Sequence, residues 1–154
     1  MIRIVTDTTS GLPPDLARRY GIPVTPQVII FGEEEYLELE ELSVSEFMRK
    51  LTSADELPKT AAPAPAALEE AYRPFVAAGD TILSIHPSAE LSGTVRSAVV
   101  AAQSFPDADI RILDTRTIGA PLGRMVMLAA HWVEEGQSAE EIMARLQALI
   151  PRQR

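Results

Sequence analysis

The sequence contains no cysteine and only two histidines, His86 and His131, among 154 residues. Without cysteine there is no disulfide bond, no thiolate nucleophile and no cysteine-ligated metal. Two imidazoles are too few for a typical zinc site. We therefore expect no structural or catalytic metal and no bound cofactor.

Long apolar runs are also missing. No stretch approaches the roughly 18 apolar residues that cross a bilayer, and the chain opens on strand-like residues instead of a charged leader with an apolar run behind it. We expect a cytoplasmic protein with no integral membrane association.

Positive charge is scarce: 14 Lys and Arg residues stand against 22 Asp and Glu residues, a formal net charge of −8. Such a field repels nucleic acid and anionic membrane surfaces, so neither is an expected partner. It also opposes a free anionic ligand. An anion site would need local donors, with Lys59 or Arg96 as nearby positive charge.

Length and an apolar content of 46% indicate one ordinary domain with a real core. We expect this domain over residues 1–150, followed by a short basic tail over 151–154. Expected strands lie at 2–7, 23–31, 81–86 and 110–114. Expected helices run from Pro13 or Pro14 to 21, over 43–52, 66–78, 90–105 and 119–135, and from 138 onward.

Strands that alternate with helices of this length need crossover connections. They indicate an α/β fold: a three-layer sandwich with a mostly parallel sheet and helices on both faces. Residues 33–42 fit a short exposed strand or hairpin at an edge. Pro26 indicates that the strand at 23–31 lies at an edge or carries a bulge. Three prolines favour an ordered loop at 57–65.

The most informative motif is Leu91-Ser92-Gly93-Thr94, placed between an expected strand and the helix-like run 95–105. Ser92 offers a hydroxyl, Gly93 has no Cβ to block a ligand, and the first N–H groups of a helix are unpaired. Together with the helix dipole, these donors favour a phosphate or a carboxylate. On spacing alone, an ordinary N-cap is the simpler explanation of the same residues.

A second hydroxyl-bearing segment, Leu57-Pro58-Lys59-Thr60, completes a pattern that resembles the DegV family, bacterial two-domain proteins that bind long-chain fatty acids. The resemblance covers nearly the whole chain. Further matching pieces, in order, are residues 4–9, 12–14, 20–22, 24–26, 31–32, 46–47, 84–86, 97–98 and 112–115.

The resemblance implies that Thr60 and Ser92 hold a fatty acyl carboxylate, that Gly93 and Thr94 line the turn beside it, and that the protein presents the acid to a partner fatty acid kinase. It implies no catalysis. The family's second domain is absent, so we expect part of the acyl chain to lack cover. The sequence departs from the family's usual residues at two local positions: it has Ala61-Ala62 where the family has Ser-Gln, and Glu38-Leu39 where the family has Asp-Gly.

Two alternatives remain. The first is an interaction module that pairs with a separately encoded complementing domain or with itself as a homo-oligomer, because missing cover exposes apolar surface. The second is a Mg²⁺-dependent phosphotransfer enzyme that uses Asp7 and Asp114 at the carboxyl ends of parallel strands. Against the second, an Asp that follows a strand often caps a turn. His86 and Trp132 are expected to be structural.

Overall fold

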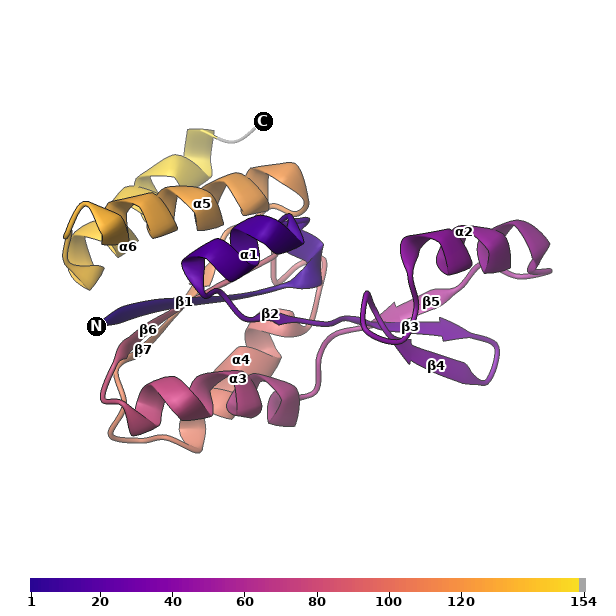
Figure 1. Ribbon diagram of the computed structural model, residues 1–154, viewed down its shortest axis with the longest axis horizontal. Coiled ribbons are helices and arrows are strands. Elements are labelled where there is room, and N and C mark those ends of the chain that lie inside the picture. Colours follow the sequence, from indigo (N-terminus) through magenta and orange to yellow (C-terminus); the bar gives the residue numbers. More distant parts are fainter. Residues whose placement is uncertain (153–154) are drawn as a thin grey trace.

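Four segments rich in β-branched residues and leucine form a parallel sheet in the computed structural model, which describes residues 1–152 (Figure 1). The strands are β1 (Ile2–Asp7), β2 (Val24–Thr25), β6 (Thr81–His86) and β7 (Ile110–Asp114). Their order is β2-β1-β6-β7, and every neighbouring pair is parallel.

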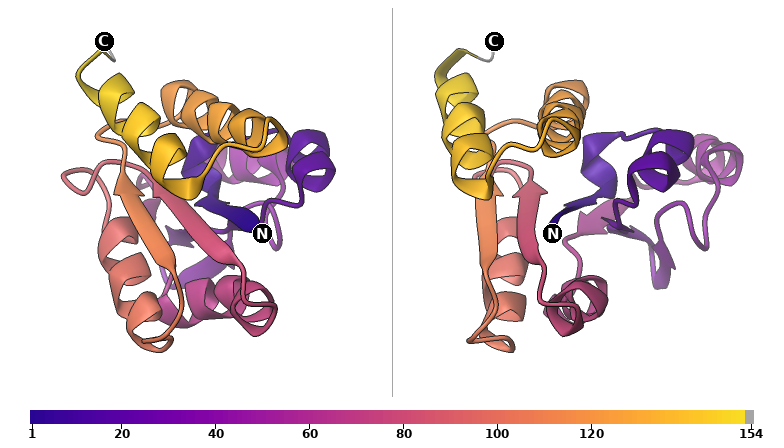
Figure 2. Two further views of the ribbon diagram at one scale, coloured as in Figure 1. Left: turned by 90° about the vertical axis from the view of Figure 1, so that its left-hand side faces the viewer. Right: turned by 60° about the vertical axis from the view of Figure 1, so that its left-hand side comes forward.

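Helices cover both faces of this sheet (Figure 2). One face carries α1 (Pro14–Tyr20), α5 (Ala120–Glu134) and α6 (Ala139–Leu149); the other carries α3 (Pro65–Ala77) and α4 (Thr94–Gln103). Short 3₁₀ turns, η1 (Thr8–Ser10) and η2 (Ile150–Arg152), follow β1 and α6. The three-layer α/β architecture expected from the sequence is therefore confirmed.

The apolar core has two parts, one on each face of the main sheet, because alternate side chains of each strand point to opposite faces. In β6, Leu83 and Ile85 pack with α5 and α6, whereas Ile82 packs with α3 and α4. Because successive side chains of a strand point to opposite faces, Ser84 and His86 share the α3/α4 face with Ile82. This face therefore carries polar side chains toward the carboxyl ends of the strands.

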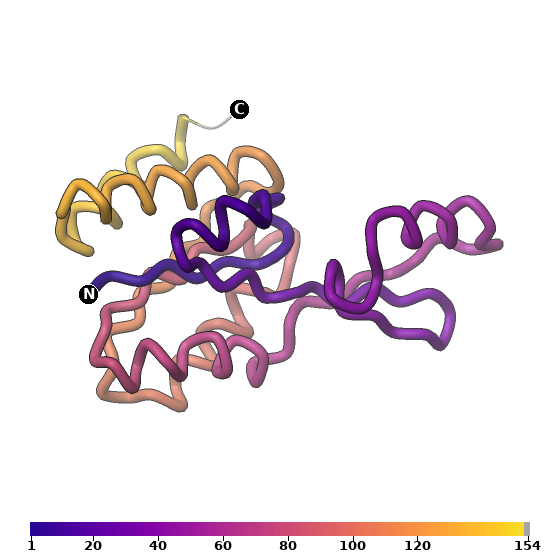
Figure 3. The backbone as a smooth tube through the Cα atoms, in the orientation of Figure 1, coloured from indigo at the N-terminus to yellow at the C-terminus, as the bar shows by residue number. Residues whose placement is uncertain are grey.

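A small antiparallel sheet lies outside the main one. It has the order β4-β3-β5, with β3 (Val28–Phe31), β4 (Glu34–Leu37) and β5 (Lys59–Ala61), and it is accompanied by α2 (Val44–Ser53). The chain enters this part after β2 and returns into α3 (Figure 3). Within residues 33–42, where a short exposed strand or hairpin was expected, the structure forms the short strand β4, which pairs with β3. The capping box of Ser43 with Glu46 opens α2 as predicted.

Three expected elements were wrong in detail. Residues 23–31 do not form one strand: the segment at Pro26 and Gln27 divides it between two sheets. Residues 57–65 are not all loop, because Lys59–Ala61 pairs with β3 and the prolines flank it. The helix expected over 90–105 begins only at Thr94, since the N–H groups of residues 91 and 92 bond back to the Ser88 carbonyl in a turn.

Of the expected basic tail, residues 151–152 belong to η2, and residues 153–154 lie outside the described part of the chain. Among residues 1–152, no helix combines the length and the apolar character that crossing a bilayer requires.

Candidate functional site

A cleft of about 540 Å³ lies where the turn before α4 meets the small sheet. This volume is in the usual range for small-molecule sites. Its lining residues are Thr9, Gln27, Ile29, Glu38, Phe47, Pro58, Thr60, Ala62, Leu91, Ser92, Gly93 and Ile118. Three of the four sequence-predicted site residues, Thr60, Ser92 and Gly93, therefore line one cleft.

Strand geometry brings Thr60 to this cleft. In β5, Thr60 lies directly opposite Ile29 of β3, and both residues line the cleft. Its neighbour Lys59 points the other way and lines a separate cavity beside residues 54–57. Arg96 is exposed on α4 and does not line the cleft. The expectation that Lys59 or Arg96 supplies local positive charge is thus not met at the cleft wall.

The turn before α4 touches the end of β5. Gly93 has φ −73° and ψ −1°, a conformation open to any residue, and it is the N-cap of α4. A Cβ atom added to Gly93 would lie 3.5 Å from Ala62 Cβ, an ordinary contact. The hydroxyl-bearing segments around Thr60 and Ser92 therefore pack directly against each other through Gly93 and Ala62.

Thr94 lies behind Ser92 instead of in the cleft, because its side chain has no exposed surface. Its backbone N–H donates to Ser92 Oγ at 3.3 Å, and the two side-chain oxygens are 2.8 Å apart. Ser92 is therefore not the N-cap residue, which is Gly93, but its Oγ accepts the N–H of the first helical residue and also lines the cleft. The two interpretations of the motif do not exclude each other.

A fully buried carboxylate, Asp7, organises the polar groups beneath the cleft. Its Oδ1 accepts from the Thr9 N–H, the Thr9 hydroxyl and Gln27 Nε2, the last at 3.2 Å. Its Oδ2 lies 2.7 Å from His86 Nδ1. The second hydrogen of the Gln27 amide goes to Thr94 Oγ1 at 3.1 Å. Every polar atom that the structure places around Asp7 is a donor, as a buried anion requires.

Away from the cleft, Asp7, His86 and Ser84 are connected in the same order as the Asp-His-Ser triad of a hydrolase. His86 Nε2 lies 2.6 Å from Ser84 Oγ, which in turn lies 2.6 Å from the Tyr72 hydroxyl. However, Ser84, His86 and Tyr72 have no exposed surface and none lines the cleft. Burial raises the pKa of Tyr72 to about 12. A substrate cannot reach Ser84, so this trio holds β6 to α3 and to β1, and His86 is structural as expected.

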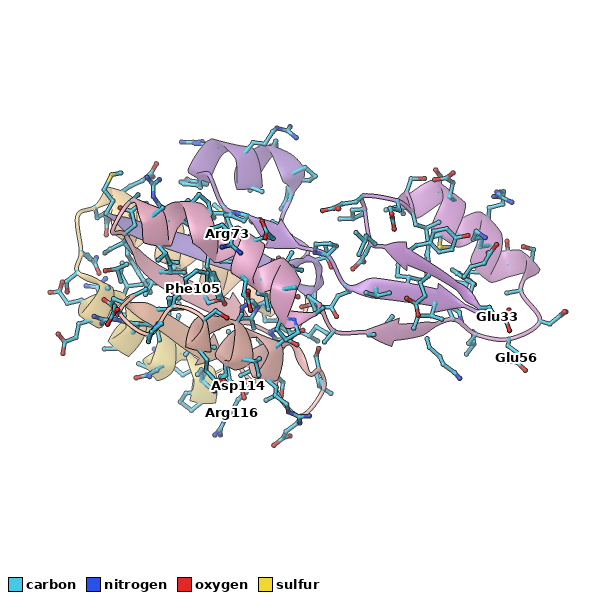
Figure 4. The ribbon with its side chains drawn as sticks, turned by 90° about the horizontal axis from the view of Figure 1, so that it is seen from below. Glu33, Glu56, Arg73, Phe105, Asp114 and Arg116 are labelled. Atoms are coloured by element: carbon cyan, nitrogen blue, oxygen red, sulfur yellow. The ribbon has the colours of Figure 1, made fainter. Side chains whose placement is uncertain are left out.

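The hypothesis of a Mg²⁺ site finds no geometric support. Asp7 is saturated by internal donors, and Asp114 Oδ1 accepts the Arg116 N–H at 2.8 Å, a turn cap at the end of β7 (Figure 4). Over residues 1–152, no group of three or more His, Cys, Asp or Glu side chains is arranged to hold a metal ion.

Glu38 is the single charged side chain that lines the cleft within the described residues. Its carboxylate accepts from the Thr8 hydroxyl, whose oxygen accepts the Gln27 N–H at 3.0 Å. The next residue, Leu39, has φ +66°, the left-handed conformation that suits glycine. The loop therefore keeps a left-handed residue at the position where the sequence departs from the family's Asp-Gly.

The sequence did not single out Gln27, Glu38, Phe47 or Ile118 as candidate site residues. For Gln27 the sequence shows only a polar residue between Pro26 and the apolar run 28–31, and its burial becomes visible only in the fold. Phe47 and Ile118 carried no signal, because an apolar residue on a helix or in a loop is most simply assigned to the core.

Comparisons with known proteins identify the family of the chain. The family described as "Uncharacterised protein, DegV family" matches residues 1–154. DegV domain-containing proteins from Clostridium perfringens and Deinococcus radiodurans are 36% and 35% identical over 141 and 150 residues, which are 92% and 97% of this chain. These alignments cover only 50% and 53% of the two relatives, so the chain spans about half their length.

Two solved structures share the fold closely. One is a DegV family protein from Thermus thermophilus whose structure is described as showing fatty acid binding. It is 38% identical, with a TM-score of 0.89, and the match covers 97% of this chain and 53% of that chain. DegV from Bacillus subtilis, described as a fatty acid binding protein, is 29% identical with a TM-score of 0.88 over 97% of this chain and 54% of that chain.

Proposed function

The chain belongs to the DegV family, and from this premise we propose that it binds a long-chain fatty acid whose carboxylate is held in the cleft by the hydroxyls of Thr60 and Ser92. Gly93 lines the cleft next to Ser92, and the buried Thr94 forms hydrogen bonds with Ser92 Oγ. The related proteins from Thermus thermophilus and Bacillus subtilis are described as binding fatty acids.

One observation carries the proposal. Two hydroxyls from segments 32 positions apart in the sequence, Thr60 on β5 and Ser92 before α4, line the same cleft. The Thr60 hydroxyl faces the cleft and makes no hydrogen bond within residues 1–152. A carboxylate accepts up to four hydrogen bonds, so it suits paired hydroxyl donors at the start of a helix.

The electrostatics of the cleft suit a monoanion and not a phosphate. Its described lining includes no cation, so an anion is held by neutral donors and the positive end of the α4 dipole, the latter worth about 0.3–1 kcal/mol. The carboxylate of Glu38 opposes additional negative charge. A doubly charged phosphate would carry this repulsion twice without a compensating Lys or Arg.

Apolar residues provide a route for the acyl chain. Ile29, Phe47, Leu91 and Ile118 line the same cleft, and Leu91 and Ile118 are 67% and 44% exposed. Each methylene that they cover contributes about 0.8 kcal/mol. These four side chains cover only part of an acyl chain of palmitate length.

Titration of the delipidated protein with palmitate tests the proposal. Ser92→Ala and Thr60→Val should each weaken binding about tenfold, because each removes a hydrogen bond to a charged group. Ser104→Ala is the matched control: Ser104 is exposed at the far end of α4 and bonds to Glu69. Undetectable palmitate binding, or equal affinities for the three variants, would contradict the proposal.

The family resemblance supports a further role, presentation of the bound acid to a partner fatty acid kinase. The sequence contains no Gly-x-x-x-x-Gly-Lys-Ser/Thr nucleotide loop of its own. An interaction module is the second candidate, favoured by the exposed Leu91 and Ile118 at the cleft rim. Sedimentation over a concentration range distinguishes it, since self-pairing raises the apparent mass with concentration whereas fatty acid binding alone does not.

A further inference from the structure

We infer that Gln27 and Thr94 are positioning residues that fix the direction of the Ser92 hydroxyl, so that Ser92 can only donate its hydrogen to a ligand in the cleft. This inference rests on the proposed function and deepens it, because it makes the site selective for a head group that accepts hydrogen bonds. It follows from the order of donors and acceptors in the buried network.

The first step concerns the Gln27 amide, which is 6% exposed. Its side-chain nitrogen lies 3.2 Å from Asp7 Oδ1, a carboxylate oxygen that can only accept. The atom facing Asp7 must therefore be the NH₂ group. One of its two hydrogens goes to Asp7, and the other is directed to Thr94 Oγ1 at 3.1 Å.

The second step follows at Thr94. Because Thr94 Oγ1 accepts from Gln27, its own hydrogen needs an acceptor, and the neighbouring oxygen recorded for it is Ser92 Oγ at 2.8 Å. A fully buried hydroxyl is costly to leave unpaired. Thr94 therefore donates to Ser92, and not the reverse.

The third step reaches the cleft. Ser92 Oγ accepts from the Thr94 hydroxyl and from the Thr94 backbone N–H, which occupies both acceptor positions of a hydroxyl. Its remaining group is its hydrogen, and Ser92 is the member of this chain of bonds that is half-buried and lines the cleft beside Gln27. The Ser92 hydrogen is thus left for the ligand.

The hydrogen bonds on the other side of Asp7, through His86 and Ser84 to Tyr72, can also be assigned with every donor directed toward Asp7. The high pKa of Tyr72 keeps its hydroxyl protonated. Tyr72 then donates to Ser84, Ser84 donates to His86 Nε2, and His86 Nδ1 donates to Asp7, so each of these contacts has one donor and one acceptor. Asp7 receives donors from both branches, which anchors the Gln27 amide.

A double-mutant cycle in the full chain tests the inference, with palmitate as the probe. Thr94→Val keeps the shape of the side chain but removes the hydroxyl, and should weaken palmitate binding about fivefold, because Ser92 is then free to turn its hydrogen away. Thr94→Ser restores the hydroxyl and should bind within about twofold of the wild type. In a Ser92→Ala background, Thr94→Val should have no further effect beyond about twofold.

The outcomes separate the inference from the proposed function. If wild-type protein binds palmitate and Ser92→Ala weakens it, but Thr94→Val binds like wild type or weakens binding equally in the Ser92→Ala background, the positioning role is overturned and fatty acid binding stands. If wild-type protein does not bind palmitate, both fail. Should Thr94→Val not fold by circular dichroism, Gln27→Met replaces it, with the same expected fivefold loss and the same cycle with Ser92→Ala.

Discussion

Replacing Gly123 by alanine should destabilise the protein, although alanine is the better helix former. A Cβ atom on Gly123 of α5 would lie 2.4 Å from the Ser10 carbonyl oxygen, closer than real Cβ atoms approach. The oxygen belongs to backbone, and Ser10 is held by its hydroxyl, which donates to the Asp7 carbonyl at 2.8 Å. Either α5 or η1 must therefore move by more than half an ångström.

Forced overpacking of this kind costs about 1–3 kcal/mol, and the better helix propensity of alanine returns about 0.5–1 kcal/mol. Because the contact is with backbone, we expect the upper part of the difference, a loss of about 2 kcal/mol in the free energy of unfolding. If η1 is the element that moves, Thr9 moves with it at the cleft wall, and palmitate binding then weakens as well.

Urea denaturation followed by circular dichroism measures the change in the free energy of unfolding. Gly93→Ala is the matched control, since its Cβ would meet Ala62 Cβ at an ordinary 3.5 Å, and its stability should stay within about 1 kcal/mol of the wild type. If Gly123→Ala unfolds at the same or a higher urea concentration than the wild type, α5 does not pack against η1 closely enough to exclude a Cβ atom.

Three further predictions concern stability. Leu39→Gly should be about 1 kcal/mol more stable than Leu39→Ala by urea denaturation, because glycine accepts the left-handed φ of +66° without strain; equal stabilities would contradict this. Hydrogen bonds from Arg3 and the amino terminus lower the pKa of Asp80. A lowered folded-state pKa adds stability above the unfolded-state pKa that is lost as the pH falls through the folded-state value. Asp80→Asn should therefore lose stability at pH 7 and progressively less as the pH falls below the unfolded-state pKa, and a loss independent of pH would refute the ion pair. Tyr72→Phe should cost about 1 kcal/mol in thermal denaturation, since it removes the donor to the buried Ser84 hydroxyl; an unchanged melting temperature would contradict that bond.

Much of the fold could be predicted because its signals are local. The alternation of apolar strands with capped helices, such as the capping box of Ser138 with Glu141 that opens α6, directly indicated the parallel sheet with helices on both faces. What could not be predicted was non-local. The short strand β5 exists because β3 offers it a partner, with Ile29 paired to Thr60, 31 positions later in the chain. No periodicity within three residues shows this.

For the candidate site, too, local signals could be read from the sequence and non-local ones could not. Ser92 was reached from local chemistry alone, because a serine before a helix start offers both a cap and an anion donor. Thr60 depended on the family resemblance, since nothing near it in the sequence indicates that β5 faces the turn at Gly93. Gln27 lies between two sheets, and its role as the link from Asp7 to Thr94 arises only when the strands are assembled. The expected charges at Lys59 and Arg96 failed for a related reason: nearness in sequence to a site residue does not fix the direction of a side chain.

The most direct test of the site is the crystal structure of the protein with palmitate bound. We predict one carboxylate oxygen within about 2.5–3.0 Å of Ser92 Oγ and a carboxylate oxygen at a similar distance from Thr60 Oγ1, with the acyl chain running past Ile29 and Phe47. A carboxylate bound elsewhere, or one that contacts neither hydroxyl, would contradict the assignment of this cleft as the head-group site.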